Sequence, residues 1–187
     1  MKTDCIDYTI EFFSFWHCGS GLAAGADADE LVIRDEDGLP FVPGRTVKGL
    51  LRGAAVTLCS MDPTRFSKAF IDDLFGSSGD EEGHGKKGSA SFTNATLDER
   101  SAIIAANLQE GLYSSIASTA IGGDGIAKDH SLRKIEAVVP CTVHGKIYGV
   151  PGSCVDGLRA CMAMVKRMGT GRSRGLGRCE FRICGED

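Results

Sequence analysis

Several patterns that would assign a sequence to a common class of protein are missing from this chain. No apolar run approaches the ~20 residues that a membrane span requires, and the N-terminus has neither the basic nor the apolar part of a signal peptide. None of the eight cysteines forms a CxxC pair, and their other spacings match no common zinc motif. We therefore expect a cytoplasmic protein with no membrane partner, reduced thiols and a single domain over residues 1–187.

Patterns that bind a single nucleotide are also missing. GxxxxGK[ST] does not occur, and the glycine-rich stretch GTGRSRGLGRCEF, from Gly169 to Phe181, lacks the third glycine of GxGxxG. The expected order around this stretch is helix, loop, strand, so no helix N-terminus would face a bound anion. Its positive charge must come from arginine side chains and loop amides, which suits an extended phosphate chain. A tight connection with solvated arginines is the alternative.

Positive charge is scarce overall but concentrated near the C-terminus. The formal net charge is −4, yet residues 101–187 hold 11 Lys+Arg against 8 Asp+Glu, whereas residues 1–100 hold 10 against 17. The cations of the last quarter are Arg159, Lys166, Arg167, Arg172, Arg174, Arg178 and Arg182. Such a cluster predicts a phosphate-binding stripe, with a solvated helix face and a basic strand end as the alternative.

Periodicity predicts an α+β fold. Ile6, Tyr8, Ile10 and Phe12 alternate as in a strand with one face in the core. We expect a strand over 6–16, a loop over 17–30, a hairpin over 31–44, a helix capped by Thr46 and an insertion over about 75–89. A strand over 89–97, a helix begun by Asp98, an arm, a strand over 135–150, a helix from Ser153 to Met168 and a strand over 179–184 follow. This order indicates an antiparallel sheet with helices on one face, as in ferredoxin-like folds.

Two stretches in this order give the sequence a family resemblance. LPFVPGRTVKGLLRGAA (39–55) has an apolar-Pro-Gly segment that enters a helix with Lys-Gly and Arg, and GTGRSRGLGRCEF provides a GxGxxxGxG-type loop before the last strand. The chain thus resembles the RAMP superfamily, the RNA-binding subunits of CRISPR effector complexes. Within it, the chain is most similar to the repeated backbone subunit of type III complexes.

The resemblance implies a fold and a set of partners. The expected fold is a modified RRM-like palm with a thumb hairpin at about residues 119–140 that wedges between bases. The expected partners are guide RNA (crRNA), target RNA, further copies of the chain and other effector subunits. One departure is Gly122-Gly123, where family thumbs often carry an Asp-Arg pair, so base wedging or target contacts would differ.

The resemblance also implies which residues bind RNA. Arginines of the glycine-rich loop would hold guide phosphates while the glycines let the backbone come near. Gly49 and Gly53, four apart on the expected helix, each cost it about 1 kcal/mol relative to alanine, so we expect a packed strand or an RNA backbone to approach them closely. The implied RNA-binding residues are His17, Arg45, Lys48, Arg52, Gly169, Gly171, Arg172, Arg174, Gly175 and Arg178.

Catalytic members of the family use one aspartate and a divalent metal ion to cleave target RNA. In ADADELVIRD that position falls on Asp29, with Asp27 as the fallback and Mg²⁺ as the expected metal. The carboxylate could position the metal or take the proton from a 2′-hydroxyl. Three readings stay open: an endoribonuclease within a complex, a non-catalytic scaffold with a merely solvated acidic loop, and a stand-alone guide-processing endonuclease. The last would use a histidine base, for which His17, His84, His130 and His144 are available.

Overall fold

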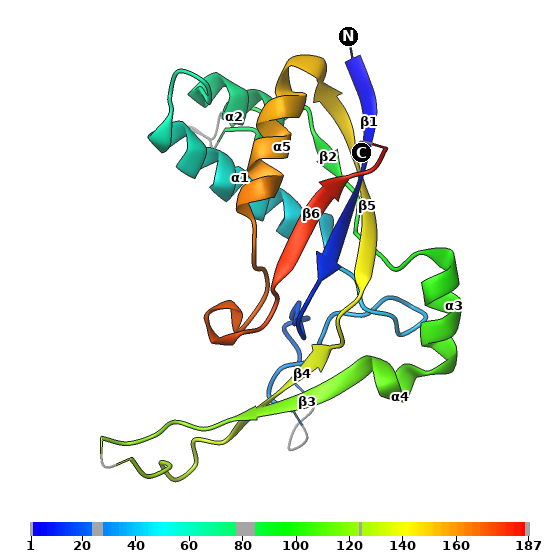
Figure 1. Cartoon of the computed structure of the whole chain (residues 1–187), viewed down its shortest axis with the longest axis vertical. Helices are drawn as coiled ribbons and strands as arrows, with labels where there is room; N and C mark the ends of the chain where they lie inside the picture. Colours follow the sequence, from blue (N-terminus) through cyan, green and yellow to red (C-terminus); the bar gives the residue numbers. More distant parts are fainter. Residues whose placement is uncertain (1, 24–27, 78–84, 124, 186–187) are drawn as a thin grey trace.

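A four-stranded antiparallel sheet forms the centre of the protein (Figure 1). The computed structural model describes residues 2–23, 28–77, 85–123 and 125–185. The strand order is β2-β5-β1-β6. Their bounds are β1 Lys2–Phe12, β2 Ser91–Phe92, β5 Thr142–Pro151 and β6 Cys179–Ile183. The register places Ile6 opposite Ile147, and Ile10 between Val143 of β5 and Phe181 of β6.

One face of this sheet is covered and the other is open. Ile6, Tyr8, Ile10 and Phe12 alternate into the core, as the sequence pattern predicts. Helices α1 (Gly44–Met61), α2 (Lys68–Phe75) and α5 (Val155–Met164) lie on the covered side (Figure 1). The opposite face carries polar side chains, such as the ion pair between Asp7 and Lys146 at 3.0 Å. The predicted α+β fold with an antiparallel sheet and helices on one face is therefore confirmed.

Helix α1 begins two residues before the predicted cap. The N-cap residue, Pro43, makes no side-chain hydrogen bond to the first turn of the helix. The side-chain oxygen of Asn94, from another segment, instead accepts a hydrogen bond from the Gly44 N–H at 3.1 Å. A Cβ atom on Gly44 would lie 2.3 Å from the Phe92 carbonyl oxygen, so this helix end packs tightly against the β2 segment. By contrast, no described residue comes within 4 Å of a Cβ built on Gly49 or Gly53. The expectation of a packed strand there is wrong.

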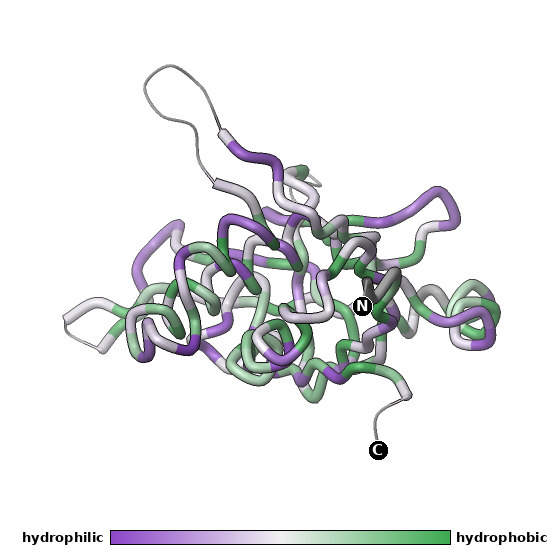
Figure 2. The backbone as a smooth tube through the Cα atoms, turned by 90° about the horizontal axis from the view of Figure 1, so that it is seen from above, coloured by the Kyte–Doolittle hydropathy of each residue, from purple (hydrophilic) through white to green (hydrophobic). Residues whose placement is uncertain are grey.

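The thumb is a hairpin that projects away from the palm (Figure 1). It consists of β3 (Tyr113–Ser118) and β4 (Arg133–Val138), so it begins earlier than residue 119. The strand predicted over 135–150 is in fact two strands in different sheets, because the chain leaves β4 at Val138 and enters the palm at Thr142. Seen from above, several of the outermost stretches of the described backbone consist of hydrophilic residues, drawn in purple in Figure 2.

The remaining elements connect these parts. Asp98 caps α3 (Glu99–Asn107) as predicted, accepting from the Ser101 N–H at 2.6 Å, and α4 (Gln109–Leu112) leads into the thumb. Before α5, a 3₁₀ turn, η1 (Gly152–Cys154), replaces the predicted cap by Ser153, and α5 ends at Met164 rather than at Met168. A second 3₁₀ turn is η2, Arg172–Arg174.

The segment 31–44 differs from the predicted hairpin, and part of the predicted insertion lies outside the described residues. Over 31–44 the predicted hairpin is reduced to one bridge between Arg34 and Pro40, whereas Val32 and Val42 bridge to Gly19 and Ala95 outside the segment. Of the insertion, residues 78–84, which include His84, lie outside the described residues, and Gly76 pairs with Lys87 at its base. Across the described ranges, no helix is both long and apolar enough to cross a membrane.

Candidate nucleic-acid interface

The glycine-rich loop between α5 and β6 is folded tightly against the segment that follows β1. All four of its glycines, Gly169, Gly171, Gly175 and Gly177, have a positive φ. A Cβ atom on Gly169 would lie 2.1 Å from the His17 carbonyl oxygen, and one on Gly177 would lie 1.8 Å from the Met168 carbonyl oxygen. At these two positions only glycine fits without moving the backbone.

Backbone hydrogen bonds hold this loop in place. The Thr170 N–H donates to the His17 carbonyl at 3.1 Å, and the Gly177 N–H donates to the Phe15 carbonyl at 2.7 Å. Within the loop, the Arg174 N–H donates to the Gly171 carbonyl at 2.7 Å. The loop is thus a defined turn rather than a loose connection.

This turn presents two arginines to solvent. Arg172 and Arg174 form η2 at its tip and are exposed. In the part of the chain that the structure describes, neither guanidinium makes a hydrogen bond or an ion pair with another side chain. Their charges are therefore free to meet an anion such as an RNA phosphate.

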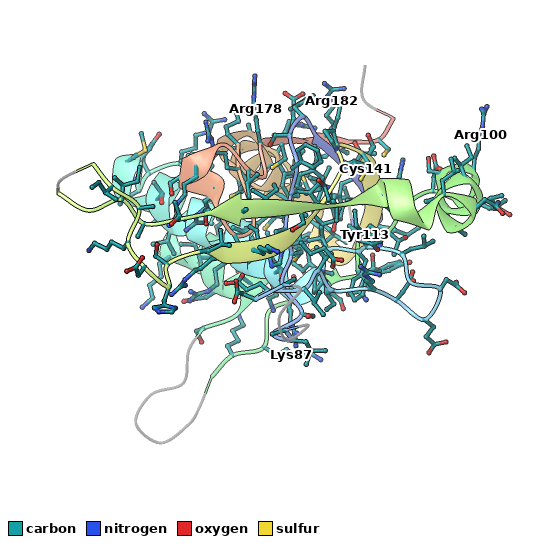
Figure 3. All side chains as sticks on the ribbon, turned by 90° about the horizontal axis from the view of Figure 1, so that it is seen from below. Lys87, Arg100, Tyr113, Cys141, Arg178 and Arg182 are labelled. Carbon is teal, nitrogen blue, oxygen red and sulfur yellow. The ribbon has the colours of Figure 1, made fainter. Side chains whose placement is uncertain are left out.

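Arg178 lies at the end of the same loop, beside the sheet. Its backbone N–H donates to the Ser14 hydroxyl at 2.9 Å, and its guanidinium carbon lies 5.7 Å from the centre of the Phe13 ring. Figure 3 shows Arg178 and Arg182 on the same side of the molecule. The structure therefore brings the three predicted loop arginines to one region.

His17 lies beneath this loop and is completely buried, with 0% of its surface exposed. Its Nδ1 lies 2.6 Å from the Glu136 carbonyl oxygen on β4, to which an N–H at Nδ1 donates, and its Nε2 lies 3.5 Å from the Glu30 carboxylate. Its own carbonyl oxygen holds the loop at Thr170. His17 thus connects the loop to the base of the thumb, and its ring has no surface open to RNA in this structure.

Asp29 lies beside β4 of the thumb. Its backbone N–H donates to the Lys134 carbonyl at 2.8 Å, and its Oδ2 accepts from the Lys134 N–H at 2.7 Å. The neighbouring Glu30 carbonyl accepts from the Glu136 N–H at 3.0 Å, so this segment runs beside β4. Asp29 is exposed, and among described residues its Oδ1 makes no hydrogen bond or ion pair. Asp27 lies outside the described residues.

The described residues near Asp29 fit only one mode of metal binding. No group of three or more His, Cys, Asp or Glu side chains placed to hold a metal ion occurs within the described ranges. Mg²⁺ often binds proteins through one or two carboxylates and takes its other ligands from water and substrate phosphates. The Oδ1 atom of Asp29 suits that mode, in which RNA would complete the site.

The cations of α1 divide into two positions. Arg45, at the helix start, lies near the buried Cys18, whose thiol pKa is raised by burial and lowered in part by a hydrogen bond with Thr46 and by the Arg45 charge. Because Cys18 follows His17, Arg45 is close to the loop region. Lys48 and Arg52 instead line a separate hollow with Lys86 and Lys87.

Lys86 and Lys87, which line the hollow beside Lys48 and Arg52, were not among the RNA-binding residues predicted from the sequence. Lys86 forms an ion pair with Asp73 at 2.5 Å, whereas Lys87 has no ion pair with any described residue. Figure 3 shows Lys87 on the opposite side of the molecule from Arg178. The signal in the sequence was the pair of lysines between glycines, GKKG, at the end of the insertion.

Comparisons with known proteins agree on a family and a fold. A family model described as the RAMP superfamily matches residues 9–150. A chain from the cryo-EM structure of the type III-B Cmr-beta bound to cognate target RNA has a TM-score of 0.69 and 12% sequence identity, covering 97% of this chain and 98% of that chain. A chain from the apo state of type III-B Cmr-beta gives the same TM-score and identity over 98% of both chains. None of the curated proteins matches the chain.

Proposed function

The chain belongs to the RAMP superfamily, and from this premise we propose that it is a guide-RNA-binding backbone subunit of a type III CRISPR effector complex. The observation that carries the proposal is the tightly folded glycine-rich loop with Arg172 and Arg174 exposed and unpaired among the described residues. The fold shared with chains from two structures of type III-B Cmr-beta, one of which has cognate target RNA bound, supports the choice of complex. The proposed partners are guide RNA, target RNA, further copies of this chain and other effector subunits.

The loop would bind the guide through its phosphates rather than its bases. Guanidinium groups pair well with phosphate oxygens, and such contacts carry no sequence information, as a guide of variable sequence requires. Gly169 and Gly177 allow the backbone to fold over His17 and Met168, which fixes the turn that carries the arginines. His17 would act as a positioning residue for the loop, and Arg45 would lie beside it.

The thumb would contact the duplex between guide and target. Its tip exposes the large apolar side chains of Ile121, Ile126 and Leu132, which favours insertion between bases over contact with phosphates. Arg133 and Lys134, at the end of β4 nearer the thumb tip, would remain available to the RNA backbone. Because Gly122-Gly123 replaces the charged pair common in related thumbs, apolar contacts would dominate at this tip.

Cleavage of target RNA is proposed for Asp29. Its Oδ1 would accept the proton of a 2′-hydroxyl or hold a divalent ion, while Oδ2 stays bonded to the Lys134 N–H and fixes the orientation of the carboxylate. Mg²⁺, when bound, would supply charge stabilisation for the phosphate that is attacked. The attacking 2′-oxygen belongs to the RNA and bonds to the adjacent phosphorus while the P–O5′ bond breaks, and the leaving 5′-oxygen would take a proton from water. No nucleophile from the protein is needed.

A non-catalytic scaffold is the second candidate, and one observation favours it. The two hydrogen bonds between Asp29 and Lys134 already give this aspartate a structural role, because they attach the 28–32 segment to the thumb. An aspartate kept for that reason alone requires no chemistry. The two candidates share the guide-binding loop and differ only in cleavage.

Guide binding is tested by the dependence of affinity on salt. Each phosphate contact on a single strand contributes about 0.7 to the slope of log K against log[salt], so Arg172→Ala with Arg174→Ala should lower the slope by about 1.4 and weaken binding. Arg100→Ala is the matched control, because Arg100 is exposed and lies at the far edge of the molecule in Figure 3. An unchanged slope in the double variant would refute the loop assignment.

Cleavage is tested in the assembled complex with Mg²⁺ and a labelled RNA complementary to the guide. Asp29→Asn is the sharper variant, because the amide oxygen can still accept from the Lys134 N–H while the negative charge is lost. We expect regularly spaced cuts in the wild type and none in Asp29→Asn at equal RNA binding. Cuts that persist in this variant would remove Asp29 from the chemistry, and a wild type that never cuts would favour the scaffold.

A further inference from the structure

A large aromatic side chain is exposed next to the proposed guide-binding loop. Phe13 directly follows β1 and leaves 45% of its surface open. The buried Phe12 before it stacks on Trp16 in the core, with ring centres 4.4 Å apart. Burial in the hydrophobic core therefore accounts for an aromatic residue at position 12, but it does not account for one at position 13.

Backbone pairing places Phe13 in a row with two cations. Phe12 is paired with Cys179, and the Phe13 N–H donates to the Arg178 carbonyl at 2.9 Å, so Phe13 and Arg178 are directly opposed. Arg178 is in turn bridged to Arg167. Opposed residues of antiparallel segments project to the same face. Because Phe12 and Cys179 face the core, the row points to the open side of the sheet.

This row lines a hollow with a positive charge. Its walls are Phe13, Lys166, Arg167, Arg178, Cys179 and Glu180. The single acid, Glu180, is ion-paired with Arg182 at 2.6 Å, so it does not fully offset the three cations. Within the described residues, Lys166 and Arg178 have no ion pair. An aromatic face beside several cations matches one nucleotide, whose base stacks while its phosphate is neutralised.

The hollow is continuous with the loop. The Arg167 guanidinium donates to the Arg172 carbonyl at 2.8 Å, so the cation that borders Phe13 also supports the turn η2. An RNA strand held at Arg172 would meet Arg167 before it reaches Phe13. Beyond this point the charges on the open face of the sheet are paired, because Arg182 forms ion pairs with both Glu180 and Glu11.

We propose that Phe13, Lys166, Arg167 and Arg178 form a nucleotide subsite, in which the base of the RNA residue next to the loop stacks on the Phe13 ring. The proposal rests on the proposed function, since it assumes that the loop binds single-stranded RNA. It adds a contact to a base where the loop provides contacts to phosphates only. Stacking tolerates every base, so the subsite is compatible with a guide of variable sequence.

The test compares an RNA oligomer with an oligomer of the same length that lacks its bases but keeps its phosphates, both titrated by fluorescence anisotropy. Phe13→Leu keeps an apolar side chain and removes the aromatic ring. It should weaken binding of the base-bearing RNA about 5- to 100-fold and leave the abasic oligomer unchanged. Tyr148→Leu is the control, because Tyr148 is an aromatic residue with the same exposed fraction, 45%, but does not line the hollow.

A second variant reports on stacking directly. Phe13→Trp should keep the affinity, and the fluorescence of the introduced indole should be quenched by base-bearing RNA but not by the abasic oligomer. The natural Trp16 is buried, with 1% of its surface exposed, so its signal should stay constant. Absence of quenching at saturating RNA would overturn the proposal.

The outcomes separate the subsite from the proposed function. Equal losses on both oligomers in Phe13→Leu would make Phe13 a structural residue and refute stacking. If Phe13→Leu alters only self-association, measured by sedimentation, the surface contacts protein and the subsite is wrong. If Arg172→Ala with Arg174→Ala weakens both oligomers while Phe13→Leu weakens neither, guide binding stands and the subsite fails. If none of these variants matters, the proposed function fails too.

Discussion

Asp29 and Lys134 are joined by two hydrogen bonds, one between their backbones at 2.8 Å and one from the Lys134 N–H to the Asp29 carboxylate at 2.7 Å. The residue proposed for chemistry thus also attaches the acidic loop to the thumb. An alanine variant alone would confuse these roles, because it removes the charge and the hydrogen bond together.

Two substitutions at Asp29 should therefore differ in stability. Asp29→Ala should lower the free energy of unfolding by about 1 kcal/mol, the usual contribution of one such hydrogen bond, whereas Asp29→Asn should lower it by less. Urea unfolding of the purified protein measures the difference. Equal stabilities of the two variants would show that the bond to Lys134 contributes nothing, and loss of cleavage in Asp29→Ala could then be read without this complication.

Two glycines of the loop should respond differently to alanine. Both Gly169 and Gly175 have a positive φ, which costs an L-residue about 1–2 kcal/mol. Only at Gly169 would the added Cβ also meet the backbone, at 2.1 Å from the His17 carbonyl oxygen, whereas the space around Gly175 is open. Gly169→Ala should therefore lower the melting temperature and the RNA affinity more than Gly175→Ala, and similar effects would contradict the packing described for this loop.

The phenol of Tyr8 offers a route to higher stability. Its hydroxyl is buried and has no hydrogen-bond partner among the described residues, and burial raises the pKa of this phenol. Tyr8→Phe should increase the free energy of unfolding by about 1–2 kcal/mol, because an unsatisfied buried polar group is removed. Tyr148→Phe, on an exposed side chain of β5, should change it little. A loss of stability in Tyr8→Phe would indicate a partner for the hydroxyl.

Lys86 and Lys87 line the hollow beside Lys48 and Arg52. If RNA reaches this hollow, the two lysines should contribute unequally to RNA binding. Lys86 is already paired with Asp73 at 2.5 Å, whereas Lys87 has no such partner among the described residues. Lys87→Ala should lower the salt slope of RNA binding by about 0.7, and Lys86→Ala by less. Equal slopes for wild type and Lys87→Ala would mean that the strand does not pass over this side of the molecule.

Local signals in the sequence were sufficient for several elements. The alternation of Ile6, Tyr8, Ile10 and Phe12 predicted β1, and Asp98 predicted the start of α3, because both depend on neighbouring residues. Elements that depend on distant partners were misplaced. Helix α1 begins at Gly44 rather than at the predicted cap, since Asn94 supplies the cap from another segment.

The thumb shows the same dependence. Tyr113–Ser118 has few strong strand formers, and it becomes a strand because it pairs with Arg133–Val138. The sequence likewise treated 135–150 as one strand, because nothing local marks the passage from thumb to palm. Phe13 was read as an ordinary residue of that first strand, and its exposure follows only from pairing with Arg178.

The sequence by itself determined the composition of the loop and the pattern of the core. Four glycines and three arginines within Gly169–Arg178 specify a turn that can carry charge, and alternation specifies which face of β1 is buried. Only the tertiary structure decided that His17 lies buried under the loop, that Asp29 is bonded to the thumb, and that Phe13 lies beside Arg167 and Arg178. These relationships join segments far apart in the chain, and contacts of that kind are fixed by packing and backbone pairing rather than by local sequence.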